Sequence, residues 1–180
     1  MASKRQRTLL LRVFILIALL LLTIFLVQKR NQIKEFADFG YAGIFLVSIL
    51  SNATLIMPIP GVVFTSAMGA VFNPFWVALA AGFGAALGEL TGYLAGFSGQ
   101  FVIDRKDWYQ ELTKWMKKYG DLTVLVMAFI PNPFFDLTGI IAGALKMPVA
   151  RFLFWCAIGK ILKMLIFALT GSSMMQYVGL

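Results

Sequence analysis

Four ionisable side chains lie in the middle of long apolar stretches: Glu89, Asp136, Lys160 and Lys163. A charge at bilayer depth costs at least about 2.5–3.5 kcal/mol, so each is expected to pair with an opposite charge or to face water. In a functional interpretation, Glu89 and Asp136 line a polar cavity, balance one lysine and leave the other to meet a lipid phosphate. In the alternative, Glu89–Lys160 and Asp136–Lys163, or the swapped pairs, are neutralised ion pairs that only hold the helices together.

Two polar residues near this set, Asn132 and Arg151, also have two interpretations each. Asn132 would present its amide to a headgroup, or it would cap a helix that begins near Leu137. Asp136 could cap the same helix, and as a cap it would be a poor proton carrier. Arg151 would bind anionic headgroups at the cytoplasmic face, or it would anchor a membrane span at the interface.

The side chains that most enzymes use are missing from the sequence. It contains no histidine, and its one cysteine, Cys156, lies in an apolar run where a buried small side chain is expected. No disulfide, zinc cluster or Cys–His pair can therefore form within the chain. No nucleophile–base pair or phosphate-binding loop is visible. We therefore expect no enzymatic activity, no cofactor and no metal.

The composition indicates an all-α integral membrane protein. Of the 180 residues, 60% are hydrophobic and 13% are charged, and the mean hydropathy is +0.84. Soluble proteins are only about 45–50% apolar. The net charge of +8 indicates cytoplasmic loops that meet anionic lipid headgroups, and not a nucleic-acid partner.

Proline-rich turns divide two apolar regions into pairs of short arms. Proline lacks an N–H and pushes the preceding residue out of helical geometry, so a helix must break at each turn. Backbone groups freed at that depth must be satisfied by protein or trapped water. The pattern predicts two re-entrant hairpins, with arms 41–57 and 62–72 in the first and the segment 122–146 in the second. The turn residues are Pro58, Pro60 and Gly61 in the first hairpin, and Pro131 and Pro133 in the second.

Three apolar stretches are predicted to cross the bilayer: residues 9–27, 75–97 and 149–171. The second carries a glycine every four residues, the spacing that lets helix backbones approach closely. Between the second and third, residues 104–119 predict an amphipathic helix that lies in the interface with aromatic anchors. The glycines are Gly84, Gly88, Gly92 and Gly96.

The two halves of the chain match as an internal repeat. Pro58 and Pro131 are 73 residues apart, as are Pro60 and Pro133. A single span separates the two predicted hairpins, so the second half would be inverted relative to the first. With the N-terminus in the cytoplasm, this topology keeps most lysines and arginines inside.

The expected organisation therefore has three parts. Residues 1–38 form an N-terminal anchor helix and link, and residues 172–180 form a short tail. Residues 39–171 form the membrane domain, with repeats 39–99 and 121–171 on either side of the interfacial helix.

Several short motifs together resemble the DedA family, also called the VTT or SNARE-associated Golgi protein domain. The resemblance covers about residues 39–171. It implies two opposed re-entrant hairpins and lipid translocation, of undecaprenyl phosphate or phospholipids in bacterial members and of phospholipids in eukaryotic relatives. The motifs are Pro58-x-Pro60-Gly61, Gly84-x-x-x-Gly88-Glu89-x-x-x-Tyr93 with Gly96 and Gly99, Phe129-Ile130-Pro131, Ala142-Gly143, Met147-Pro148 and Arg151-Phe152.

The sequence departs from the family pattern where charged residues are expected. Val62 stands where many bacterial members carry an acid after the first Pro-Gly. Ala128 and Phe134 stand where they carry arginines around Phe-Ile-Pro. Proton coupling through that acid and phosphate capture through those arginines are therefore not carried over to this chain.

The sequence predicts a translocase or scramblase that moves phospholipid or polyprenyl-phosphate headgroups through a groove between the hairpins. The alternatives are a small proton- or ion-coupled transporter that uses Glu89 and Asp136, and a membrane scaffold that transports nothing. The expected partners are membrane lipids, with anionic headgroups at the cytoplasmic face, and the sequence is compatible with a homo-oligomer. The expected location is a bacterial or archaeal plasma membrane.

Overall fold

The computed structural model describes residues 37–53, 61–99, 107–131 and 135–178. Within these ranges every regular element is a helix. The predicted N-terminal span 9–27 and the residues Pro58, Pro60, Asn132 and Pro133 lie outside the described residues. The helices are α3 (Ala37–Ala53), α4 (Gly61–Val71), α5 (Pro74–Gly88), α6 (Leu90–Phe97), α7 (Asp107–Phe129), α8 (Phe135–Ala144) and α9 (Val149–Val178).

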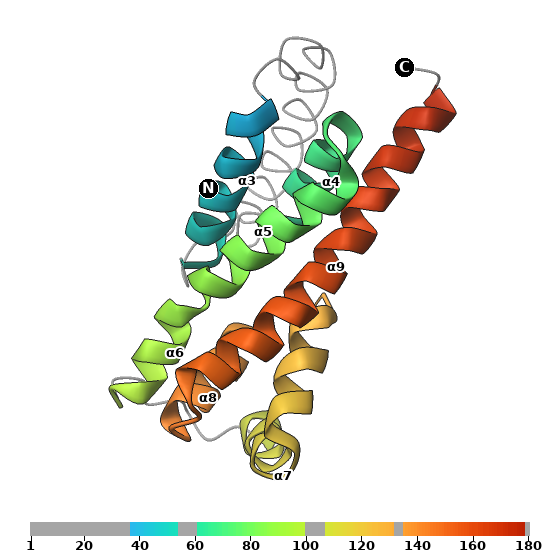
Figure 1. The fold of residues 1–180 in the computed structure, drawn as a ribbon. Coiled ribbons are helices and arrows are strands. Elements are labelled where there is room, and N and C mark those ends of the chain that lie inside the picture. The colour runs from blue at the N-terminus through green and yellow to red at the C-terminus, as the bar shows by residue number, and fades with distance from the viewer. Residues whose placement is uncertain (1–36, 54–60, 100–106, 132–134, 179–180) are drawn as a thin grey trace, which may run out of the picture.

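Two long helical rods run side by side through the molecule (Figure 1). One is α9. The other is α5 continued by α6, because the amide of Glu89 bonds to the Ala85 carbonyl at 3.2 Å and the amide of Tyr93 bonds to the Glu89 carbonyl at 3.1 Å. Residues Pro74–Phe97 and Val149–Met175 are long and apolar enough to cross a bilayer, which takes about 20 residues.

The rods begin where the sequence predicts, but one of them ends later. The side chain of Asn73 accepts a hydrogen bond from the amide of Phe75 at 3.0 Å. Pro74 occupies the first helical turn, where its missing N–H costs nothing. α9 continues past Gly171, the predicted end of the last span, to Val178.

Before the first rod, α3 and α4 lie beside one end of the two rods (Figure 1). α3 packs along α5, and α4 packs along α9. The start of α3 meets the end of α4, since a Cβ added at Gly40 would lie 2.7 Å from the Phe72 ring. The amide of Asn73 also donates a hydrogen bond to the hydroxyl of Tyr41 at 3.3 Å. The chain therefore enters α3 and leaves α4 at the same end of the molecule.

At the other end of the rods lie α7 and α8 (Figure 1). α7 bends at Gly120, whose φ of 15° and ψ of −80° are not helical. The hydroxyl of Thr123 donates across this bend to the Trp115 carbonyl at 3.2 Å. The bend separates the predicted interfacial helix from the segment that packs along α9. The start of that segment is tied to the start of α9 by an ion pair between Asp121 and Arg151.

Four glycines bring the short helices of one half against the rod of the other half. A Cβ added at Gly69 would lie 2.3 Å from a carbonyl oxygen of α9, and one at Gly171 would lie 1.9 Å from a carbonyl oxygen of α4. In the same way, a Cβ at Gly143 would lie 2.0 Å from a carbonyl of α6, and one at Gly96 would lie 1.9 Å from a carbonyl of α8. α4–α9 and α8–α6 are thus matching crossings, each made by a glycine from both helices.

The predicted glycine stripe serves two different partners. Gly84 and Gly88 face the backbone of α3, whereas Gly96 faces α8. Gly92 is also buried. α3 is too short to cover the whole stripe, because it ends at Ala53, opposite Gly88. Gly96, farther along the stripe, contacts α8 instead.

Large apolar side chains remain exposed along the outside of both rods. Exposed apolar area on this scale is unusual for a soluble protein, and it suits a surface in contact with lipid. The residues include Phe75, Trp76, Phe83 and Leu94 on the first rod, and Phe154, Leu162, Ile166 and Leu169 on α9.

Candidate functional site

A buried ion pair joins the two rods where they cross. Glu89 lies at the junction of α5 and α6, and its carboxylate oxygen Oε1 is 2.5 Å from Nζ of Lys160 on α9. The two side chains are 2% and 4% exposed. Removing both charges from water is costly, and their attraction in this setting offsets the cost only with close contact and further hydrogen bonds.

The further hydrogen bonds come from α3. Nζ of Lys160 also donates to Oδ1 of Asn52 at 2.9 Å. The amide nitrogen of Asn52 donates in turn to the Ser48 carbonyl at 2.9 Å. This hydrogen bond orients the amide of Asn52 so that its oxygen faces the lysine. We call Glu89, Lys160 and Asn52 the buried charge centre. Three helices meet in it.

Glycines directly before the two charged residues make this contact possible. A Cβ at Gly88 would lie 2.5 Å from the Ile49 carbonyl, and a Cβ at Gly159 would lie 2.6 Å from the Leu125 carbonyl. Because these glycines have no side chain, the first rod packs closely against α3 and α9 packs closely against α7. Glu89 and Lys160, which follow the two glycines, lie next to these close contacts and are buried.

A second lysine lies on the same rod. Lys163, one helical turn beyond Lys160, is 8% exposed. Of the buried charged side chains in the described part of the chain, two are cations and one is an anion. Electrostatic interactions among these buried charges are strong, because the dielectric constant of the interior is low.

Cys156 lies one turn before Lys160 and is fully buried in an apolar cluster with Val124 and Ala128. This confirms the sequence prediction of a buried small side chain.

Two fully buried threonines, Thr65 on α4 and Thr138 on α8, occupy matching positions in the two halves, at the same offset as the prolines. The hydroxyl of Thr65 donates to the Gly61 carbonyl at 2.8 Å. Sequence reasoning overlooked both threonines, although the repeat offset would have paired them.

The predicted site residues are only partly brought together. Of the two ion-pair arrangements considered from the sequence, the structure contains the Glu89–Lys160 pair. Asp136 is the second residue of α8, and its side chain lies outside the described residues. Arg151 is far from the buried charge centre in the fold, at the start of α9, where Nε and Nη2 contact Oδ2 of Asp121 at 2.9 and 2.7 Å.

Asn52 is a member of the centre that sequence reasoning missed. Its signal was the polar pair Ser51-Asn52 within the largely apolar first arm, 41–57. Within the described residues, no three His, Cys, Asp or Glu side chains lie close enough together to hold a metal ion. The chemistry available at the centre is therefore charge pairing and hydrogen bonding to an anion.

Comparison with known proteins identifies the family. The VTT domain matches residues 59–173. The uncharacterized membrane protein YbfM of Bacillus subtilis is 31% identical over 149 residues, which cover 75% of this chain and 90% of YbfM. The uncharacterized protein MJ0201 of Methanocaldococcus jannaschii is 29% identical over 143 residues, which cover 75% of this chain and 86% of that protein.

A shorter match reaches a plant protein: the vacuole membrane protein KMS2 of Arabidopsis thaliana is 34% identical over 65 residues, 36% of this chain and 15% of KMS2. No solved structure matches the chain. The resemblance inferred from the proline and glycine motifs is confirmed, and the chain belongs to the VTT domain family of membrane proteins.

Proposed function

We propose that this protein moves lipids across the bilayer, with the headgroup passing between the two rods near the buried charge centre. The observation that carries the proposal is a pair of buried lysines and one carboxylate at the crossing of two membrane-length helices. Charged groups at this depth are rare and usually mark a transport path. A lysine ammonium is a hydrogen-bond donor that suits the phosphate of a lipid headgroup.

The arrangement of the short helices supports a path of this kind. α3 and α4 begin and end together at one end of the rods, and Asp121 and Arg151 join the equivalent points at the other end. We propose that each pair is a re-entrant hairpin and that the two enter the membrane from opposite faces. Sites built by broken helices near the midplane of inverted repeats are common in transporters.

The same proposal sets the orientation. The lysine-rich part of α7 lies on the cytoplasmic side under the positive-inside rule. Relatives with matching sequences occur in a bacterium and an archaeon, and the proposed location is therefore the plasma membrane, with the N-terminus in the cytoplasm.

Reconstitution tests the proposal directly. The purified protein is inserted into vesicles that contain fluorescent phosphatidylglycerol or phosphatidylcholine, and a membrane-impermeant reductant bleaches the lipids in the outer leaflet. A translocase makes the inner-leaflet lipids accessible too. A polyprenyl phosphate is tested in parallel vesicles. If bleaching stops at the outer leaflet for every lipid, the protein acts as a scaffold and the proposal fails.

Coupled transport of an ion or a proton is the second candidate, and the burial of Glu89 favours it. A buried carboxylate can bind and release a proton as its surroundings change. Lipid or ion movement that follows an imposed pH gradient, and loses that dependence in Glu89→Gln, would support coupling. If the rate of lipid movement does not depend on the pH gradient, the result supports translocation without proton coupling.

A further inference from the structure

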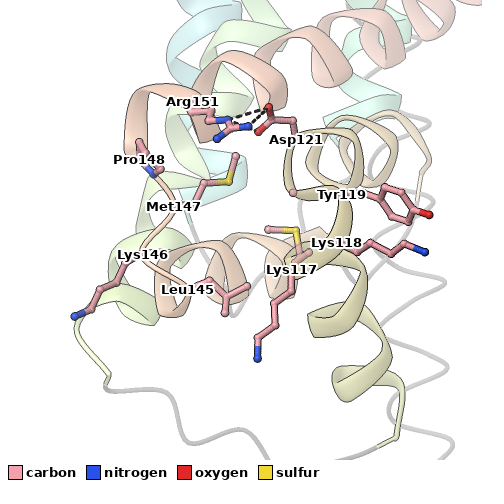
Figure 2. A pocket seen from close by; sticks show the side chains of 11 residues that line it. Lys117, Lys118, Tyr119, Asp121, Leu145, Lys146, Met147, Pro148 and Arg151 are labelled. Carbon is pink, nitrogen blue, oxygen red and sulfur yellow. Dashed lines mark hydrogen bonds and ion pairs between the residues drawn. The ribbon is translucent and has the colours of Figure 1, made fainter.

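A cleft of about 590 Å³ lies on the outer side of the bend in α7 (Figure 2). One wall is the α7 bend from Met116 to Asp121, and the other is the turn between α8 and α9 with the start of α9. We call it the lysine cleft, because its lining includes Lys117, Lys118 and Lys146 together with Arg151. Among the described residues that line it, Asp121 is the only acidic one.

Two of these cations already have partners in the structure. Arg151 is held by Asp121, whose two carboxylate oxygens both contact the guanidinium. The ammonium of Lys118 lies 4.9 Å from the centre of the Tyr119 ring, in a cation–π contact. Lys117 and Lys146 lie on opposite walls of the cleft, and in Figure 2 their side chains point away from each other. Both are exposed, so each long side chain is free to rotate toward an anion in the cleft.

The backbone at Lys146 is strained in a way that its side chain does not explain. Its φ of 55° is left-handed, and it is the single non-glycine residue with positive φ in the described ranges. It follows the end of α8, where the amides of Lys146 and Met147 return to the carbonyls of Gly143 and Ala142 at 2.9 and 3.0 Å. Helix ends of this type strongly prefer glycine. A lysine at such a position points to a use for its charge.

An apolar groove of about 180 Å³ meets the lysine cleft at Tyr119. It follows α7 across the bend and is lined by the exposed side chains of Trp115, Leu122 and Val126 and by the partly buried side chains of Leu112 and Met127. A cationic cleft and an apolar groove that share Tyr119 are together complementary to a molecule with a negatively charged head and a hydrocarbon tail. Exposed Trp and Tyr at the junction are typical of the membrane interface.

We propose that the lysine cleft and the apolar groove together bind one anionic phospholipid. Its phosphate lies between Lys117 and Lys146, and an acyl chain follows the groove beside Trp115. This binding site is separate from the buried charge centre, and it stands whether or not the protein moves lipids. It would hold the α7 bend at the surface of the membrane.

Trp115 provides a direct probe because it lines the groove. In a variant that retains Trp115 and carries phenylalanine at the other three tryptophans, fluorescence is quenched by lipids with brominated acyl chains. Brominated phosphatidylglycerol is compared with brominated phosphatidylcholine in vesicles. The expected result is a preference for phosphatidylglycerol of roughly fivefold or more. One basic residue near an anionic headgroup strengthens the binding of that lipid by about fivefold. Native mass spectrometry of the unaltered chain checks the preference without any tryptophan substitution.

Matched variants separate the site from general charge attraction. Lys117→Gln and Lys146→Gly are each expected to lower the preference roughly fivefold. Lys114→Gln removes the same charge from an exposed position on the same helix, outside the cleft, and should leave the preference unchanged. Lys146→Gly is also expected to raise the midpoint of thermal unfolding, since glycine accepts the left-handed backbone. Loss of binding in this variant would therefore not reflect loss of folding.

Three results would overturn the proposal. One is equal quenching of Trp115 by the two lipids in the chain with all its lysines. Another is an equal loss of preference in Lys114→Gln and Lys117→Gln, which would indicate only a diffuse charge effect. The third is displacement of the lipid by inorganic phosphate at millimolar concentration, which would indicate a free-anion site.

Discussion

Removing the charges of Glu89 and Lys160 singly and together distinguishes a structural ion pair from a functional one. The variants are Glu89→Leu, Lys160→Met and the double substitution. Each single change leaves one charge buried at 2–4% side-chain exposure without the partner that contacts it at 2.5 Å. Such a change typically destabilises a protein by about 3–5 kcal/mol.

The double substitution should be much less costly than the sum of the two single changes. It replaces the pair with apolar side chains of similar volume, and such replacements are often neutral or stabilising. Oδ1 of Asn52 would lose the hydrogen bond from Lys160, at a cost of about 1–3 kcal/mol. The expected coupling energy between the two positions is therefore at least about 3 kcal/mol.

The free energy of unfolding is measured by denaturant titration in mixed micelles, and lipid movement is measured in vesicles with the same four proteins. We expect the double variant to recover most of the stability but to move lipid at least about tenfold more slowly, the loss expected when a charged hydrogen-bonding partner is removed. Lys114→Gln serves as the control for a change of net charge, because Lys114 is exposed.

Two outcomes would refute this reasoning. If the two single changes add without coupling, the side chains do not form a buried pair in the membrane. If the double variant moves lipid at the original rate, the pair only holds the rods together, and the proposed path lies elsewhere.

Three further predictions test the packing. Gly143→Ala should lower the free energy of unfolding by about 1–3 kcal/mol, because the new Cβ would lie 2.0 Å from a backbone atom of α6. The control is Gly43→Ala, where nothing lies within 4 Å of the new Cβ. In the same denaturant titration this control should be neutral or slightly stabilising. Tyr93→Phe should cost about 1–3 kcal/mol in unfolding free energy, because its hydroxyl donates to the carbonyl of Met147; an unchanged value would mean that water replaces the bond. Cys156 should react with a maleimide only after unfolding, since it is fully buried; rapid labelling of the folded protein would contradict the packing of α9.

The main helices could be predicted because they depend on local pattern. Apolar length defined both rods, and Asn73-Pro74 placed the start of the first. The end of α9 was misplaced, because the apolar pattern fades after Gly171 while the helix continues. A helix at 104–119 was predicted from the spacing of its aromatic residues, and α7 covers most of that range. That α7 bends at Gly120 without ending is a property of the packed backbone.

The candidate site could be predicted only in part. Their apolar surroundings in the sequence made Glu89, Asp136, Lys160 and Lys163 stand out, because charges in apolar segments are costly wherever the chain folds. Two sets of ion pairs were compatible with that cost, and the structure contains the Glu89–Lys160 pair of the first set. The role of Asn52 was not predictable, since nothing in the sequence places α3 beside α9 at that depth.

By itself, the sequence determined that the chain is helical, that it enters the membrane and which charges must be buried, because hydropathy and proline chemistry act locally. Tertiary structure decided which helices cross and therefore which charges meet. Glycines from both halves let α4 approach α9 and let α8 approach α6, and contacts at backbone distance depend on the complementary shapes of two surfaces. The lysine cleft arises in the same way, since Lys117 and Lys146 line one cleft only when the turn after α8 lies opposite the bend of α7.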